Sequence, residues 1–252
     1  MKRRFACGVA AARWSAVLLL VFSLEGFSQE KGENVELLGH FGGRAALLQL
    51  YALPRADGSA RVTGEYLLLT TMQRRFLEGE RSKQLGVTAL KEGNTAILYG
   101  RPPTATLQGT WSGGIFKGGR YGPGGQLREE FEFSEKFPSM DGYSASLSCN
   151  IAEGRYDSRL ALVVEKGKLK SLDWRSKVAP GDHSCALHDL EQQSFSGGLR
   201  FAAGRCAVTL RDLGEVVRVS AENCDAMCGS QAYLEPLFVD RRGDCQLIRP
   251  VQ

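Results

Sequence analysis

Between Val35 and Phe133 the chain is divided into short apolar or alternating runs that are separated by glycine-containing turns. Asp57-Gly58 and Glu92-Gly93-Asn94 are two such turn signals, of the kind that connects neighbouring strands. Thr104–Trp111 alternates polar and apolar residues with a period of two, which is typical of a strand with one buried face. Roughly seven or eight strands at a spacing of about ten residues predict an antiparallel meander, either a curled sheet or a small barrel.

The second half of the chain carries the same kind of pattern. Arg159–Glu165 and Leu169–Trp174 flank a short turn at Lys166-Gly167-Lys168, and together they predict a hairpin. Ala232–Val239 is the last apolar run, but Pro236 within it favours an edge strand or a kink. With 30 glycines in 252 residues and few helical patterns, the sequence predicts an all-β protein.

The cysteines divide the chain into two β units, because residues 29–148 contain none. An even number of cysteines in an exported chain predicts disulfide bonds formed in an oxidising compartment. Glu135–Gly142 contains a proline, a glycine and no strand periodicity, so the boundary is placed there. We expect an N-terminal Gly-rich meander domain at 29–138 and a disulfide-stapled β domain at 139–252. The cysteines expected to form disulfides are Cys149, Cys185, Cys206, Cys224, Cys228 and Cys245.

The spacing of these cysteines leaves 15 pairings open, so any specific pairing is a hypothesis. We expect Cys206–Cys224 to span a second hairpin, whose turn is Asp212-Leu213-Gly214. The other two expected bridges are Cys228–Cys245 and Cys149–Cys185.

A zinc site is the alternative use of Cys224 and Cys228. Their spacing suits half of such a site, and His183 and His188 flank Cys185. The sequence has no second close pair of cysteines, and an oxidising compartment favours disulfides. We therefore expect no metal site.

The N-terminus predicts a secretory signal peptide at residues 1–28. Met1-Lys2-Arg3-Arg4 is basic, Trp14–Leu24 is apolar, and Gly26-Phe27-Ser28 supplies small residues for cleavage. The apolar run is well short of the ~20 residues that a membrane-spanning helix needs. We expect cleavage after Ser28, and a periplasmic or secreted protein with no membrane anchor.

The formal net charge of +4 does not indicate a nucleic-acid or membrane partner. The first 28 residues carry Lys2, Arg3, Arg4 and Arg13 against one acidic residue, Glu25. The rest of the chain is therefore close to neutral, with basic and acidic residues interspersed. It lacks the basic stripe of a protein that binds nucleic acid or an anionic membrane.

Four short patterns stand in the first unit, namely Gly64-x-Tyr66, Leu77-x-Gly79, Leu90-x-Glu92 and Leu107-x-Gly109-Thr110-Trp111. Together they resemble an exported β-meander that is common in Gram-negative bacteria and mostly of unassigned function. We interpret Tyr66 and Trp111 as core or rim aromatic residues of a sheet. The glycines are interpreted as bends where another strand passes closely.

No residue pattern in the chain indicates catalysis. The sequence has no Gly-x-Ser-x-Gly or His-Glu-x-x-His motif, and no glycine-rich loop that opens a helix to bind a phosphate or dinucleotide. His183, after Asp182, and His188, before Asp189, are the plausible bases, but both fit a solvated loop. We expect neither catalysis nor a cofactor, with a hydrolase that uses His183 and His188 as an alternative.

A small exported β protein with disulfides and polar loops is suited to presenting those loops to another protein. In broad style the chain is similar to the periplasmic lysozyme inhibitors and to immunity proteins against wall-degrading toxins. The inhibitors use a Ser-Gly-x-x-Tyr-type loop, whereas Ser196-Gly197-Gly198-Leu199 lacks the tyrosine, so no inhibitory residue is assigned. We expect a non-catalytic binding protein with a protein partner in the periplasm or outside the cell.

A second hypothesis is an envelope domain that binds a small molecule or a cell-wall fragment inside a meander barrel. Its candidate ligand-contacting residues are Tyr66, Trp111 and Tyr121. An open cavity lined by these aromatic residues favours this hypothesis, and a protruding polar loop favours the inhibitor.

Overall fold

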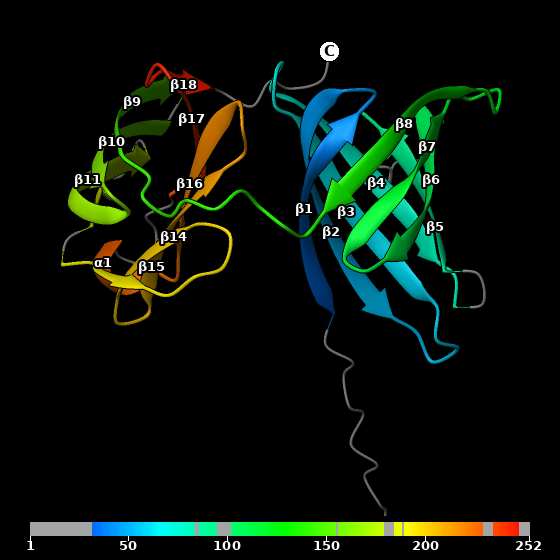
Figure 1. Ribbon diagram of the computed structural model, residues 1–252, viewed down its shortest axis with the longest axis horizontal. Helices are drawn as coiled ribbons and strands as arrows, with labels where there is room; N and C mark the ends of the chain where they lie inside the picture. The colour runs from blue at the N-terminus through cyan, green and yellow to red at the C-terminus, as the bar shows by residue number, and fades with distance from the viewer. Residues whose placement is uncertain are drawn as a thin grey trace, which may run out of the picture. The chain divides into compact units, whose positions relative to one another are not determined.

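The structure is a computed structural model that describes residues 32–83, 86–94, 102–154, 156–178, 184–187, 189–228 and 234–246. It confirms the all-β prediction, because the described strands form one closed barrel and two further sheets (Figure 1). Within these ranges no helix is long and apolar enough to cross a membrane.

The first eight strands form a closed antiparallel barrel, in which each strand pairs with the next and β8 pairs with β1. The pairing of β1 with β8 runs from Leu38 opposite Ser134 to Phe41 opposite Phe131. This pairing closes the sheet into a barrel, whereas the sequence left a curled sheet and a small barrel as alternatives. The strands are β1 (Glu33–Phe41), β2 (Arg44–Pro54), β3 (Ala60–Leu68), β4 (Gln73–Arg81), β5 (Val87–Gly93), β6 (Ala105–Ser112), β7 (Ile115–Tyr121) and β8 (Leu127–Ser134).

Aromatic side chains fill much of the barrel interior. Phe41, Phe116 and Phe133 are fully buried, and Phe131 is nearly so. The ring centroid of Phe131 lies 4.9 Å from that of Phe116 and 5.8 Å from that of Phe41, so the rings form a continuous cluster. The interior of an eight-stranded barrel is narrow enough for side chains to fill it. This aromatic cluster is the apolar core that stabilises the barrel.

Glycines that face inward let neighbouring strands of the barrel approach closely. A Cβ atom added at Gly79 in β4 would lie 1.9 Å from the carbonyl oxygen of Ala89 in β5. One added at Gly64 in β3 would lie 2.1 Å from the carbonyl oxygen of Gln49 in β2. Any side chain there would push the strands apart, so the predicted close passage of another strand is confirmed at Gly64 and Gly79, and a bend at these glycines stays a prediction.

The remaining strands form two antiparallel sheets that share one apolar core. The sheet orders are β12-β11-β10-β9 and β13-β14-β15-β16-β17-β18. Leu160 and Trp174 of the first sheet and Phe201 and Val219 of the second are fully buried in the common core. The strands and helix are β9 (Ala145–Glu153), β10 (Tyr156–Glu165), β11 (Lys168–Val178), β12 (Ser184–Ala186), β13 (Glu191–Gln193), β14 (Leu199–Ala203), β15 (Cys206–Asp212), β16 (Val216–Glu222), α1 (Asp225–Cys228), β17 (Leu237–Asp240) and β18 (Cys245–Gln246). We call this part the sandwich.

The six cysteines of the sandwich form three disulfide bonds. Cys206–Cys224 spans the β15–β16 hairpin, as predicted. The expected bridges Cys228–Cys245 and Cys149–Cys185 are wrong. Instead Cys149 in β9 pairs with Cys245 in β18, and Cys185 in β12 pairs with Cys228 in α1. The first of these joins the two sheets, an arrangement that spacing along the chain does not reveal.

The segment between the barrel and the sandwich lies where the sequence predicted a domain boundary. Met140 is buried in the core of the sandwich. Phe137 packs against another apolar cluster, which contains Leu47 of the barrel and Leu213 of the sandwich. Contacts gather residues 31–252 into one compact unit. Independent folding of 29–138 and 139–252 stays a prediction.

Candidate binding site on the barrel

Tyr66 and Trp111 belong to the interior of the barrel, as core or rim aromatic residues were predicted to do. Tyr66 in β3 is 3% exposed, and its ring centroid lies 4.6 Å from that of Phe41. Trp111 in β6 stacks on Phe116 at 4.8 Å, and its Nε1 donates a hydrogen bond to Thr88 Oγ1 at 3.1 Å. Their polar atoms are therefore used within the fold.

Glu92, near the end of β5, is fully buried and has four hydrogen bonds to its carboxylate. The donors are the Tyr66 hydroxyl (2.8 Å), Thr104 Oγ1 (3.0 Å), and Arg120 Nε (2.6 Å) and Nη2 (2.8 Å). Burial alone raises the pKa of Glu92, but the hydrogen bonds and charge of Arg120, together with the other donors, outweigh it and lower the pKa. The carboxylate is therefore ionised at neutral pH.

The network continues from Arg120 toward solvent. Arg120 Nη1 donates to Glu129 Oε1 at 2.9 Å, and Arg44 Nη2 donates to Glu129 Oε2 at 2.6 Å. The side chain of Arg44 is half exposed. The end of β5, the end of β7, the start of β8 and the start of β2 lie at the same end of an up-and-down barrel, so these charged groups lie together at that end. Their hydrogen bonds favour a structural role over catalysis.

Sequence reasoning missed this network because Glu92-Gly93-Asn94 was interpreted only as a turn. The Leu90-x-Glu92 pattern contained the signal. Leu90 is fully buried in the barrel core, and a residue two positions further along a strand points to the same side. A buried glutamate needs a cationic partner, but the sequence does not indicate that this partner is Arg120.

The three aromatic residues proposed as ligand contacts do not line one cavity. In β7, the alternation of side chains turns Phe116 and Arg120 to the inside and Tyr121 to the outside. Tyr66 and Trp111 lie inside, so the structure separates them from Tyr121 by the wall of the barrel. A ligand contact at any of the three stays a prediction.

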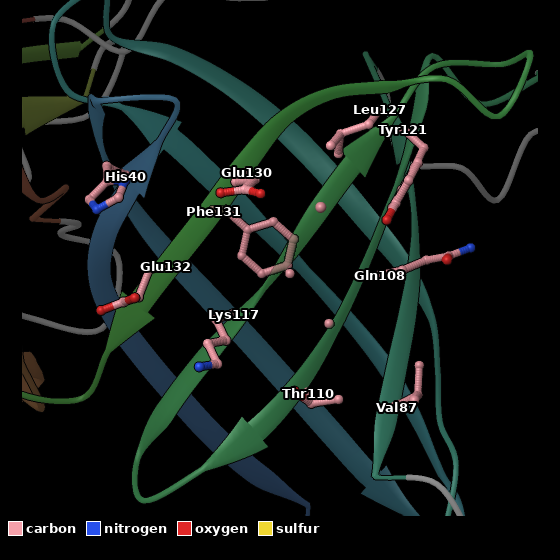
Figure 2. A pocket seen from close by; sticks show the side chains of 13 residues that line it. His40, Val87, Gln108, Thr110, Lys117, Tyr121, Leu127, Glu130, Phe131 and Glu132 are labelled. Carbon is pink, nitrogen blue, oxygen red and sulfur yellow. The ribbon is translucent and has the colours of Figure 1, made fainter.

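Tyr121 lines a groove of about 590 Å³ on the outer face of the barrel, over β6, β7, β8, the start of β5 and the end of β1 (Figure 2). Figure 2 shows Tyr121 and Leu127 at one end of the groove and Glu132 and His40 at the other, with Glu130 between them. The groove thus has a more apolar end and a more charged end.

The middle of the groove lies at Gly119, which is opposite Gln108 on β6 and Glu130 on β8. A Cβ atom added at Gly119 would lie 2.7 Å from Leu127 Cδ1 and 2.9 Å from Tyr121 Cζ. The side chains of Tyr121 and Leu127 therefore lie directly on the backbone at this glycine. Leu127 is 52% exposed, so this apolar surface is open to solvent.

Polar side chains of the groove have no partner among the described residues. No hydrogen bond or ion pair is formed there by the side chains of Gln108, Lys117, Glu130 and Glu132. By contrast, Arg61 in β3 pairs with Glu78 in β4 at 2.6 Å. The groove groups are thus available to a ligand, whereas the β3–β4 pair is already satisfied.

The groove combines an open apolar surface with polar side chains. An apolar surface flanked by a few unpaired polar groups is typical of a binding site. The described part of the chain has no group of three or more His, Cys, Asp or Glu side chains that could hold a metal ion. His183 and His188 lie outside the described residues, so the structure does not address the hydrolase hypothesis.

No protein-family model, curated protein or solved structure matches this chain. The resemblance to exported β-meander proteins therefore rests on the four residue patterns alone.

Proposed function

We propose that this chain is an exported, non-catalytic binding protein that contacts a protein partner through the groove around Gly119. The observation that carries the proposal is one groove that combines an exposed apolar surface, at Tyr121 and Leu127, with polar side chains that lack partners among the described residues. The groove is built on paired strands of a closed barrel. Little conformational entropy should therefore oppose binding.

The disulfide bonds support a site of action in an oxidising compartment, where such bonds persist. The pattern of residues 1–28 supports export to the periplasm or beyond, with cleavage after Ser28. A wall-degrading hydrolase is the class of partner that we propose, on the likeness in style to periplasmic inhibitors and immunity proteins.

Binding of a cell-wall fragment is the second candidate function, and the position of Tyr121 favours it. Its aromatic ring lies in an open groove near Gln108 and Glu130, and side chains of these types can bind sugar rings and hydroxyl groups. In this form the ligand lies on the outside of the barrel, not inside it beside Tyr66 and Trp111.

The test of the protein-partner proposal is affinity capture from periplasmic extract with the oxidised protein, followed by calorimetric titration of the purified captured protein. We expect the Tyr121→Ala, Glu130→Gln double variant to lose binding. Tyr51→Ala is the matched control, because Tyr51 is 40% exposed on β2 and does not line this groove.

Equal affinity of the double variant and the wild type would contradict the groove as the contact surface. A second variant tests the enzyme hypothesis. His183→Ala with His188→Ala should leave binding unchanged, and loss of a measurable hydrolytic activity in this variant would favour a hydrolase.

A further inference from the structure

We propose, building on the proposed function, that the part of the groove around Gly119 binds an arginine side chain of the partner protein. This part, which we call the Gly119 pocket, extends from the middle of the groove to its apolar end and consists of Gln108, Gly119, Tyr121, Leu127 and Glu130. The proposed function concerns the whole groove as the contact surface for the partner. The present inference concerns the side chain of the partner that binds in the Gly119 pocket.

Glu130 supplies an unmatched negative charge in the Gly119 pocket. Its neighbours on both sides are glycines: Gly119 lies opposite it on β7, and the N–H of Gly42, which follows β1, donates to its backbone carbonyl oxygen at 2.9 Å. Glu132, in contrast, lies between Lys117 on β7 and His40 on β1. A cation from outside can therefore reach Glu130 without displacing one that belongs to the fold.

A β-bulge in β8 forms the apolar side of the pocket. The register between β7 and β8 shifts at Arg120/Tyr121, so that Leu127, and not Arg128, lies opposite Tyr121. The Arg128 side chain is directed to the β7–β8 turn, where a Cβ atom added at Gly122 would lie 2.7 Å from its Nε. The bulge thus places an apolar side chain beside Tyr121 and leaves Glu130 without an arginine neighbour. Bulges commonly re-aim side chains at functional sites.

Arginine fits this combination better than the other common side chains. Its guanidinium group stacks on an aromatic ring and donates two parallel hydrogen bonds to a carboxylate, here Tyr121 and Glu130. The side chains of Tyr121 and Leu127 cover the backbone at Gly119, so the guanidinium group would lie on the Tyr121 ring with Glu130 beside it. Lysine lacks the planar stacking group, and a neutral sugar lacks the charge.

Four probes on the oxidised protein test this inference by amide NMR. They are an acetylated Gly-Arg-Gly amide, its citrulline and lysine counterparts, and an N-acetylglucosamine trimer. We expect the arginine peptide to bind most tightly and to shift the backbone amides of Gly119, Tyr121 and Glu130. The neutral citrulline peptide should bind about tenfold more weakly or worse, because it loses the charge.

Variants of the protein test which side chains are responsible. Glu130→Gln should weaken the arginine peptide by about tenfold and remove its dependence on salt. Glu80→Gln is the matched control, since Glu80 is an exposed carboxylate on β4 outside this groove. Equal affinity for arginine and citrulline, or shifts away from the groove, would overturn the proposal. Binding of the sugar trimer in place of the peptide would overturn it in favour of the cell-wall fragment.

Partner binding by single variants distinguishes this inference from the proposed function. If Tyr121→Ala removes partner binding and Glu130→Gln does not, the groove is the contact surface and the arginine inference is wrong. If neither variant changes partner binding, both are wrong. A double-mutant cycle between Glu130→Gln and Ala replacements of the partner's arginines should show strong coupling for one arginine.

Discussion

The carboxylate of Glu92 is held inside the barrel by Tyr66, Thr104 and Arg120. We expect Glu92→Gln to destabilise the protein by about 3 kcal/mol at neutral pH, because it leaves the partly buried guanidinium of Arg120 without its main counter-charge. Urea unfolding at equilibrium measures the difference. Glu80→Gln, which removes an exposed ion pair with Arg55, should cost less than about 1 kcal/mol.

The effect of Glu92 should depend on pH in a defined direction. The folded-state pKa of Glu92 lies below the unfolded value, which is 4.5. A lowered pKa means that the ionised form stabilises the fold fully above the unfolded pKa, and that this stabilisation is lost as the pH falls through the folded pKa. The difference between wild type and Glu92→Gln should therefore be constant above about pH 5.5 and shrink below about pH 4.5. A difference that grows on acidification would contradict the ionised state.

At the scale of the strand, two glycines should respond differently to the same substitution. Gly79→Ala places a methyl group against the backbone of Ala89, which cannot move without opening the barrel wall, so we expect a loss of about 2–3 kcal/mol in the free energy of unfolding. The three atoms nearest to a methyl group at Gly119 are instead the far ends of the Tyr121 and Leu127 side chains, which can shift more easily than backbone. Gly119→Ala should cost less than about 1 kcal/mol but weaken partner binding.

Chemical denaturation and partner titration of both variants separate the two effects. A large loss of stability in Gly119→Ala would show that the groove surface is part of the core. Unchanged partner binding in the same variant would contradict the central position of Gly119 in the contact surface.

The sequence predicts most strands of this fold because alternation and turn glycines are local signals. Thr104–Trp111 and the Asp57-Gly58 turn are confirmed as strand β6 and as the turn between β2 and β3. Closure of the barrel was not predictable in the same way, because β1 and β8 are far apart in the sequence. The outward position of Tyr121 could have been predicted from the sequence. Phe116 is apolar and alternate residues of a strand share a face, so Tyr121 lies on the opposite face from Phe116, together with Lys117 and Gly119.

At the scale of the whole molecule, the disulfides differ in the length of chain that lies between their two cysteines. The sequence separation is 96 for Cys149–Cys245 and 18 for Cys206–Cys224. If cross-links act by restricting the unfolded chain, removal of the first should cost about 4–5 kcal/mol and removal of the second about 3 kcal/mol. Paired Cys→Ala variants and urea unfolding measure these losses. Peptide mapping under non-reducing conditions checks the connectivity, and a Cys228–Cys245 peptide would contradict it.

The barrel and the sandwich each contain one described tryptophan, Trp111 and Trp174, which makes their unfolding separately measurable. Trp174→Phe leaves Trp111 as the reporter of the barrel, and Trp111→Phe leaves Trp174 as the reporter of the sandwich. We expect reductant to shift the emission of Trp174 to longer wavelength and to leave that of Trp111 unchanged. The physical reason is that every described cysteine lies in the sandwich.

Limited trypsin digestion gives an independent readout of the same prediction. Lys136 is exposed and lies between the last strand of the barrel and the first strand of the sandwich. In reduced protein we expect cleavage there to release a resistant barrel fragment, and oxidised protein should be cut more slowly, because Phe137 and Met140 are then packed. If both tryptophans respond to reductant together and no barrel fragment survives, the apolar cluster that contains Leu47 and Leu213 couples the two parts into a single cooperative unit.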